Sequence, residues 1–176
     1  MSISRAIISA ASSVVLSSAV IAAEPLPFFV EHVEALTTGR TGTPVKLNKI
    51  GVITTKATFK PSVEILVEAK TESTNLRLGY AADQLIFNWE LDGAQLRVDG
   101  GPANGKHKPG AGMIPKKQYV KVRWVVTPSK QSVFVDDQLR FEHSGDYSKL
   151  DKPISVFGSE VTVRSIKVRQ LPQAKD

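Results

Sequence analysis

Apolar and polar residues alternate in short runs along most of the chain beyond residue 51, and turn-forming residues separate the runs. A period of two is typical of β-strands with one buried face, and no segment there shows the 3.6-residue period of an amphipathic helix. The pattern therefore predicts an all-β fold built as an antiparallel sandwich or barrel. The predicted strands are residues 52–59, 63–70, 76–80, 85–91, 95–98, 120–126, 132–135, 139–142, 154–157 and 161–168.

The alternation also predicts how the three strands between residues 76 and 98 pair. A four-residue loop and a two-residue Asp-Gly turn join them, and this register keeps the apolar side chains on one face. The opposite face then holds Arg77, Asn88 and Arg97 in one cross-strand rung, with Glu90 in the adjacent rung. The register thus predicts a polar platform on one side of the sheet.

This platform has two interpretations. Guanidinium groups, an amide and a carboxylate can together hydrogen-bond vicinal hydroxyls or a sugar carboxylate, which would make the platform a ligand surface. The pattern by itself favours an ordinary solvated face, in which Glu90 offsets the repulsion between the arginines. Trp89 and Trp124 both fall on apolar faces and are predicted core residues, so no outward aromatic ring is predicted beside the platform.

Residues 99–115 are rich in glycine and proline and are predicted to form one long loop. Loops of this length in compact domains are usually functional or mobile. His107 is therefore a candidate binding residue, together with the polar Asp99 and Asn104. No Gly-Lys-Ser or Gly-Lys-Thr sequence follows a predicted strand, so the loop is not a phosphate-binding loop.

The chain has 176 residues, of which 41% are hydrophobic, and it contains no cysteine. This composition predicts one globular domain without disulfides or cysteine-based metal sites. The three histidines lack the spacing of a zinc site, and no cofactor is expected. Calcium is left open, because Asp99, Asp136 and Asp137 lie in loops without a recognisable ligand spacing.

The first 23 residues carry a single charge, Arg5, ahead of an apolar run rich in alanine and serine. This pattern predicts a secretory signal peptide that is cleaved after Ala22 or Ala23. The mature protein is therefore expected in the periplasm or outside the cell, with no membrane span. The predicted organisation is a signal peptide (1–23), a loosely structured leader (24–51), the β-sandwich domain (52–171) and a tail (172–176).

The chain has 23 Lys and Arg against 17 Asp and Glu, which gives a formal net charge of +6. Its basic residues are scattered, and export argues against a nucleic-acid partner. The charge favours an ordinary solvated surface, and after that an attraction to acidic glycans or to an anionic envelope surface. We expect a monomer.

Several motifs between residues 76 and 168 match the pattern of a known superfamily. They are residues 76–80, 85–90, 110–115, 122–124, 133–140, 145–147 and 161–168. With these motifs, the stretch from Pro61 to Leu171 resembles the concanavalin A-like lectin/glucanase superfamily, in particular the laminin G-like modules of planctomycete-type bacteria. The resemblance implies an antiparallel jelly-roll β-sandwich. It specifies the architecture better than the ligand, because the superfamily includes lectins, hydrolases and adhesion modules.

The chain departs from this superfamily at one motif. Its laminarinase-type hydrolases carry Glu-x-Asp-x-x-Glu with two catalytic glutamates, whereas here Gln95 stands at the second glutamate position after Glu90. The resemblance therefore implies a non-catalytic recognition module with a carbohydrate as the expected ligand. The predicted binding residues are Arg77, Asn88, Glu90, Arg97 and His107.

Two alternatives remain open at this point. A glycan-cleaving hydrolase would need a second carboxylate near Glu90, and Glu64 or Glu68 would supply it if their strand were a neighbour. A cell-envelope module that binds another protein, or is purely structural, would need no sugar site at all.

Overall fold

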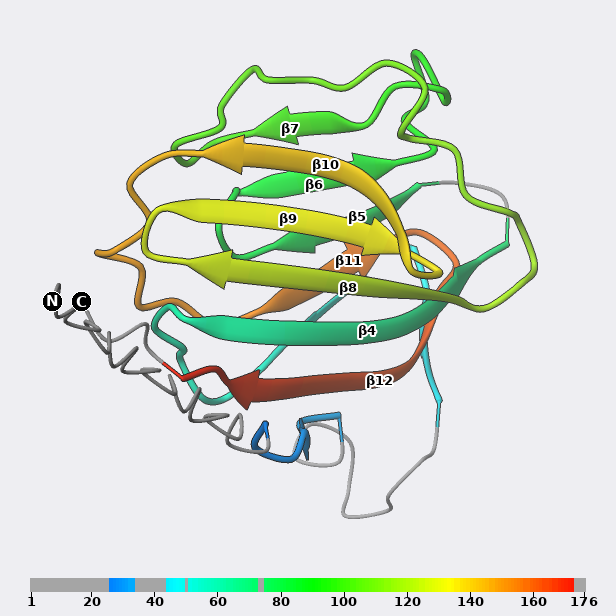
Figure 1. The fold of residues 1–176 in the computed structure, drawn as a ribbon. Helices are drawn as coiled ribbons and strands as arrows, with labels where there is room; N and C mark the ends of the chain where they lie inside the picture. Colours follow the sequence, from blue (N-terminus) through cyan, green and yellow to red (C-terminus); the bar gives the residue numbers. More distant parts are fainter. Residues whose placement is uncertain (1–25, 34–43, 50, 73–74, 173–176) are drawn as a thin grey trace, which may run out of the picture.

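The computed structural model describes residues 26–33, 44–49, 51–72 and 75–172, and the predicted signal peptide lies outside these ranges. The described residues form twelve β-strands and no helix, all paired antiparallel in two sheets that lie face to face (Figure 1). Each of the predicted strands overlaps an observed strand.

The seven-stranded sheet has the order β1-β12-β4-β8-β9-β10, and β2 also pairs with β12. Its strands are β1 (Val30–Glu31), β2 (Val45–Leu47), β4 (Val63–Thr71), β8 (Val120–Thr127), β9 (Lys130–Val135), β10 (Gln138–Ser144) and β12 (Val161–Gln170). The five-stranded sheet has the order β3-β11-β5-β6-β7. Its strands are β3 (Gly51–Thr54), β5 (Leu76–Gly79), β6 (Gln84–Phe87), β7 (Arg97–Asp99) and β11 (Ser155–Gly158).

The core lies between the sheets and is filled by alternate residues of each strand. On β4 the inward side chains of Val63, Ile65, Val67 and Ala69 are all buried, whereas the residues between them face outward. Trp124 on β8 is also buried, as the sequence predicts. The alternation encodes this arrangement because burying one face of each strand is what brings two sheets together.

Residues 26–33 and 44–49 contribute two short strands that the hydrophobic pattern did not predict. Both strands, β1 and β2, pair with β12, and Val33 joins the core. They lengthen an existing sheet edge, and strands of two or three residues are too short to show an alternation.

The predicted register of the 76–98 segment is wrong by two residues at both pairings. Arg77 pairs with Ile86, and Ile86 pairs with Arg97, so Ile86 stands between the arginines where Asn88 was expected. The shift is even, so the apolar side chains still face the core. Between β5 and β6 it arises because β5 ends at Gly79 and β6 begins at Gln84, so residues 80–83 form the turn. Between β6 and β7 it arises because β6 ends at Phe87 and residue 88 has a left-handed backbone, which leaves Asp92 and Gly93 inside a longer loop and not in a tight hairpin.

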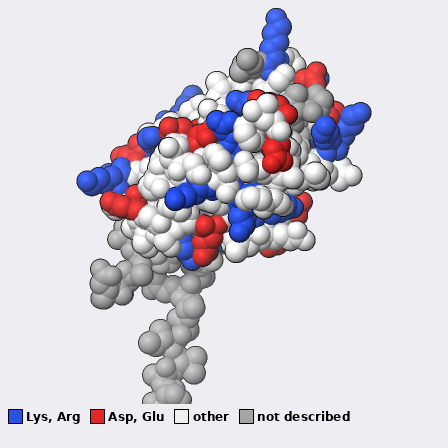
Figure 2. Space-filling model, turned by 90° about the horizontal axis from the view of Figure 1, so that it is seen from above, with Lys and Arg blue, Asp and Glu red and all other residues white. Residues whose placement is uncertain are grey.

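Positive and negative side chains are interspersed over the face of the molecule seen in Figure 2. No large area of one sign is visible on that face, in line with the scattered basic residues in the sequence. None of the described residues belongs to a helix that is long and apolar enough to cross a membrane.

Candidate functional site

A cleft of about 1160 Å³ opens at the outer face of the five-stranded sheet. Five segments contribute to its wall: the start of β5, the loop after β6, residues 113–116, β10 and the end of β11. The lining residues are Asn75, Arg77, Asn88, Trp89, Glu90, Gly93, Met113, Ile114, Pro115, Lys116, Arg140, Phe157, Gly158 and Ser159. A concavity with apolar walls and a few convergent polar groups is the usual form of a small-ligand site.

The floor of the cleft comes from one cross-strand rung of the five-stranded sheet. Register places Val52, Phe157, Arg77, Ile86 and Arg97 side by side on five successive strands. Of these, Phe157 and Arg77 line the cleft. The predicted rung therefore exists with a different composition, in which the middle position is apolar.

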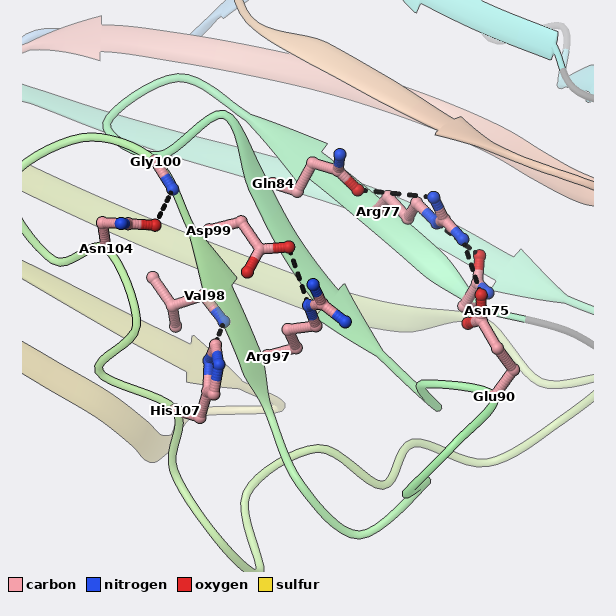
Figure 3. A network of polar contacts seen from close by, with 10 residues as sticks. All are labelled: Asn75, Arg77, Gln84, Glu90, Arg97, Val98, Asp99, Gly100, Asn104 and His107. Carbon is pink, nitrogen blue, oxygen red and sulfur yellow. Dashed lines mark hydrogen bonds and ion pairs between the residues drawn. The ribbon is translucent and has the colours of Figure 1, made fainter.

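Arg77 is the centre of a polar network on this floor (Figure 3). Its Nε donates to Asn75 Oδ1 at 2.8 Å, one terminal nitrogen donates to Gln84 Oε1 at 3.3 Å, and the other to Glu90 Oε1 at 3.1 Å. Asn75 in turn donates to Glu90 Oε2 at 2.7 Å. The guanidinium and the carboxylate thus neutralise each other and hold fixed orientations, while Glu90, with 56% of its side chain exposed, keeps acceptor capacity toward the cleft.

Trp89 lines the cleft, and its prediction as a core residue is wrong. The side chain is half-buried, because the chain leaves the sheet after Phe87 and the alternation no longer decides which way a side chain points. Leu91, predicted on the same apolar face, is 79% exposed. Phe157 is a second aromatic ring of the cleft, and the sequence carried a sign of it: Phe157 is out of phase with the buried Ile154 and Val156.

Arg97 and His107 do not line the cleft, although they were predicted to bind with Arg77. The Arg97 guanidinium lies 4.5 Å from the centre of the Trp89 ring and its Nε donates to Asp99 at 2.7 Å. His107 Nδ1 accepts the backbone N–H of residue 98 at 3.0 Å, and its ring centre lies 6.5 Å from that of Trp89. Both residues therefore pack near the Trp89 ring, and their own hydrogen bonds to Asp99 and to the backbone of residue 98 are drawn in Figure 3.

The 99–115 loop is held to the sheet along its length. Leu96 and Lys108 form an isolated antiparallel bridge, and Asn104 accepts the N–H of Gly100 at 2.7 Å. Ala103 is fully buried. Only the end of the loop, from residue 113 onward, lines the cleft. The predicted polar candidates Asp99, Asn104 and His107 instead make hydrogen bonds within the protein.

The part of the cleft wall formed by residues 113–116 is fastened by Asn88. Its Nδ2 donates to the Ile114 carbonyl and its Oδ1 accepts the Ile114 N–H, both at 3.0 Å. Asn88 has φ 50°, a left-handed conformation that asparagine tolerates better than most residues. Asn88 therefore lines the cleft as predicted, but both ends of its amide are used to position the wall.

Arg140 reaches the cleft from the other sheet, through an irregularity in β10. Pairing with β9 shifts register between Leu139 and Phe141, and such bulges often redirect a side chain. One terminal nitrogen of Arg140 donates to the Met113 carbonyl at 3.3 Å, while its buried Nε has no hydrogen-bond partner. Nothing in the alternation of the sequence marks a bulge, so this residue was not predicted.

Glu64 and Glu68, considered above as partners for Glu90, lie on β4 in the other sheet. Glu64 pairs with Arg169 and Arg123, and Glu68 with Arg164. These carboxylates face outward from the seven-stranded sheet, so the neighbouring-strand condition of the hydrolase alternative fails.

No cluster of three or more His, Asp or Glu suited to a metal ion occurs among the residues that the structure describes. Asp136 and Asp137 have φ values of 47° and 64° and form the turn between β9 and β10. Asp136 Oδ1 accepts the N–H of Lys121 at 2.9 Å. These acids therefore have a turn-forming role in the structure.

We expect Gly112→Ala to lower the free energy of unfolding by about 1–3 kcal/mol, as overpacking of a tight contact does. A Cβ at residue 112 would lie 2.2 Å from the Gln95 carbonyl oxygen. That oxygen belongs to the backbone, so it cannot move aside as the end of a flexible side chain can. Urea unfolding measures the effect. Gly93→Ala is the control, because its nearest neighbour would be 3.8 Å away. Equal midpoints for the two variants would contradict the expectation.

No protein-family model matches this chain, and no curated protein matches it in sequence. Solved structures do match its fold. The galectin LEC-6 of Caenorhabditis elegans is similar with a TM-score of 0.54 and 11% identity, over 72% of this chain and 96% of the galectin. The exoplasmic/lumenal domain of VIP36 is similar with a TM-score of 0.55 and 12% identity, over 84% of this chain and 81% of that domain.

A candidate glycosyl hydrolase from Parabacteroides distasonis is also similar, with a TM-score of 0.50 and 17% identity over 73% of this chain and 87% of its own. Identities this low establish the fold alone. The predicted all-β, antiparallel jelly-roll sandwich of the concanavalin A-like kind is confirmed. The laminin G-like subtype stays a prediction.

Proposed function

We propose that this protein is an exported, non-catalytic recognition module that binds carbohydrate in the cleft beside Trp89. The observation that carries the proposal is the composition of the cleft: the rings of Trp89 and Phe157 line it together with the Arg77–Glu90–Asn75 network. Aromatic faces suit the C–H faces of sugar rings, and fixed donors and acceptors suit their hydroxyls.

The fold neighbours support a sugar as the ligand. The VIP36 domain was solved in a form bound to Ca²⁺ and Man, and another structure with this fold, CG-16, is an agglutinin from chicken liver. The CG-16 match has a TM-score of 0.50 and 14% identity over 68% of this chain and 99% of CG-16. We place the module in the laminin G-like group, on the motifs of residues 61–171.

Binding without catalysis is favoured by the acids of the cleft. Glycoside hydrolysis generally needs two carboxyl groups about 5–9.5 Å apart. Glu90 is the one carboxylate among the described residues that line this cleft, and it is engaged by Arg77 and Asn75. Export is part of the proposal because residues 1–23 have the pattern of a signal peptide.

A glycan array probed with the purified protein, with and without a chelator, tests the proposal. We expect binding to a defined class of glycan, and Trp89→Ala to weaken it about tenfold or more through loss of ring contact. Trp89→Phe should keep most of the affinity. Leu91→Ala is the matched control, since Leu91 is an exposed apolar residue of the same loop that does not line the cleft.

Thermal unfolding of each variant separates loss of binding from loss of folding. An array without binding to neutral or acidic glycans would overturn the proposal and favour an envelope protein–protein module. Binding that Trp89→Ala and Leu91→Ala leave equally strong would keep a sugar ligand but place it elsewhere on the molecule.

A further inference from the structure

We infer that the cleft selects glycans that carry an anionic group, a carboxylate or a sulfate, and that Arg140 and Lys116 receive this group. The inference rests on the proposed function and specifies its ligand class. It starts from the charges of the wall. Three cations, Arg77, Lys116 and Arg140, line the cleft against one anion, Glu90.

Arg77 and Glu90 pair with each other at 3.1 Å. The other two positive charges, Lys116 and Arg140, have no carboxylate partner among the described residues. The charged residues that line the cleft therefore carry a net positive charge, with Arg77 and Glu90 balancing each other, and a ligand with an acidic group would complement this distribution.

Most of the N–H donors of Arg140 make no hydrogen bond to any described residue. A guanidinium carries five N–H donors, and the one hydrogen bond this group makes among the described residues is the 3.3 Å contact with the Met113 carbonyl. Its Nε is buried without a partner, which is costly for a charged donor unless something else compensates the group. An oxyanion in the cleft beside the guanidinium would supply that compensation through its terminal nitrogens, with the fork geometry that arginine offers to carboxylates and sulfates.

Lys116 lies on a fastened segment. Ile114 on one side is held by the Asn88 amide, and Lys117 on the other donates its N–H to the Thr71 carbonyl at 2.8 Å. The flexible ammonium therefore starts from a fixed backbone position at the rim of the cleft. An arginine and a lysine that line the same cleft suit an anion whose exact position varies among ligands, because the guanidinium offers a planar fork and the ammonium a flexible point charge.

Paired probes that differ only in charge test the inference: galacturonate oligosaccharides against their methyl esters, and dextran sulfate against dextran. In 150 mM salt, where the screening length is about 8 Å, we expect the acidic member of a pair to bind about tenfold or more tightly than the neutral one. The galacturonate and sulfate arms identify which oxyanion is preferred.

Arg140→Gln should weaken binding of the acidic probe about tenfold and weaken binding of the neutral probe by a much smaller factor, while Arg140→Lys should be intermediate. Lys116→Gln should show a smaller loss. Lys106→Gln is the control for charge alone, since Lys106 is exposed on the 99–115 loop and does not line the cleft. It should bind as the unmodified protein does.

Each contrary result has a distinct meaning. Equal binding of acidic and neutral probes, unchanged by Arg140→Gln, would overturn this inference and leave the proposed glycan site standing. Equal losses in Arg140→Gln and Lys106→Gln would also overturn it, since they would indicate unspecific attraction between a basic protein and a polyanion. No binding to any probe, together with an array without binding, would overturn both proposals.

Discussion

Replacing Gln131 with leucine is expected to lower the free energy of unfolding by about 2–4 kcal/mol, although the two side chains are similar in size. Gln131 lies on β9, fully buried inside the sandwich. Its Oε1 accepts the indole N–H of Trp124 at 2.9 Å, and its Nε2 donates to the Tyr147 hydroxyl at 2.8 Å. One amide is thus the hydrogen-bond partner of both the Trp124 indole N–H and the Tyr147 hydroxyl, in two buried aromatic residues.

The chain of hydrogen bonds continues to the protein surface. The Tyr147 hydroxyl lies 2.8 Å from His143 Nδ1, and because it accepts the Gln131 N–H, its own hydrogen is available for the imidazole. Burial raises the pKa of Tyr147, so the phenol is neutral at physiological pH and can donate. Leucine at position 131 would leave the buried indole N–H of Trp124 without an acceptor, and that loss dominates the expected cost.

Urea unfolding of Gln131→Leu, Tyr147→Phe and the double variant measures this network. We expect the double variant to cost less than the sum of the single ones, because each single change already breaks the bond between residues 131 and 147. Gln138→Leu, at an exposed position of β10, is the matched control and should change stability little. A Gln131→Leu variant as stable as Gln138→Leu would refute the expectation.

The strand pattern was predictable because burial repeats every second residue and the core enforces it over long strands. β4, β8 and β12 were therefore found nearly to their ends. The error at residues 88–91 has the opposite cause. Once β6 ends, Trp89 and Leu91 are no longer bound by the alternation, and their apolar character alone did not show that both would be accessible.

The candidate site was predictable in part, for the same physical reason. Arg77 lies on a strand, so its face followed from the period of two, and it lines the cleft. Arg97 also lies on the predicted face and pairs with Asp99 on the same strand, yet its contact with Trp89 depends on the loop after β6. Arg140 comes from the other sheet through a bulge, and contacts between sheets are not encoded in a local period.

Asn88→Ala is expected to weaken glycan binding about ten- to a hundredfold while lowering the melting temperature only slightly. The variant loses both hydrogen bonds to Ile114, and alanine at φ 50° adds strain of about 1–2 kcal/mol. Together these changes favour an open wall. A site that is formed in only a fraction of the molecules binds with its affinity reduced by that fraction.

Hydrogen exchange at the Ile114 amide distinguishes positioning from direct contact. This N–H donates to Asn88 Oδ1, so Asn88→Ala should exchange it faster. Asn88→Gly also removes the side chain but relieves the left-handed backbone, so it should fall between alanine and the unmodified protein. If Asn88→Ala lost binding while the Ile114 amide kept its full protection, then Asn88 would contact the ligand itself, as the polar rung first predicted. Loss of both together would establish that its amide acts through the wall.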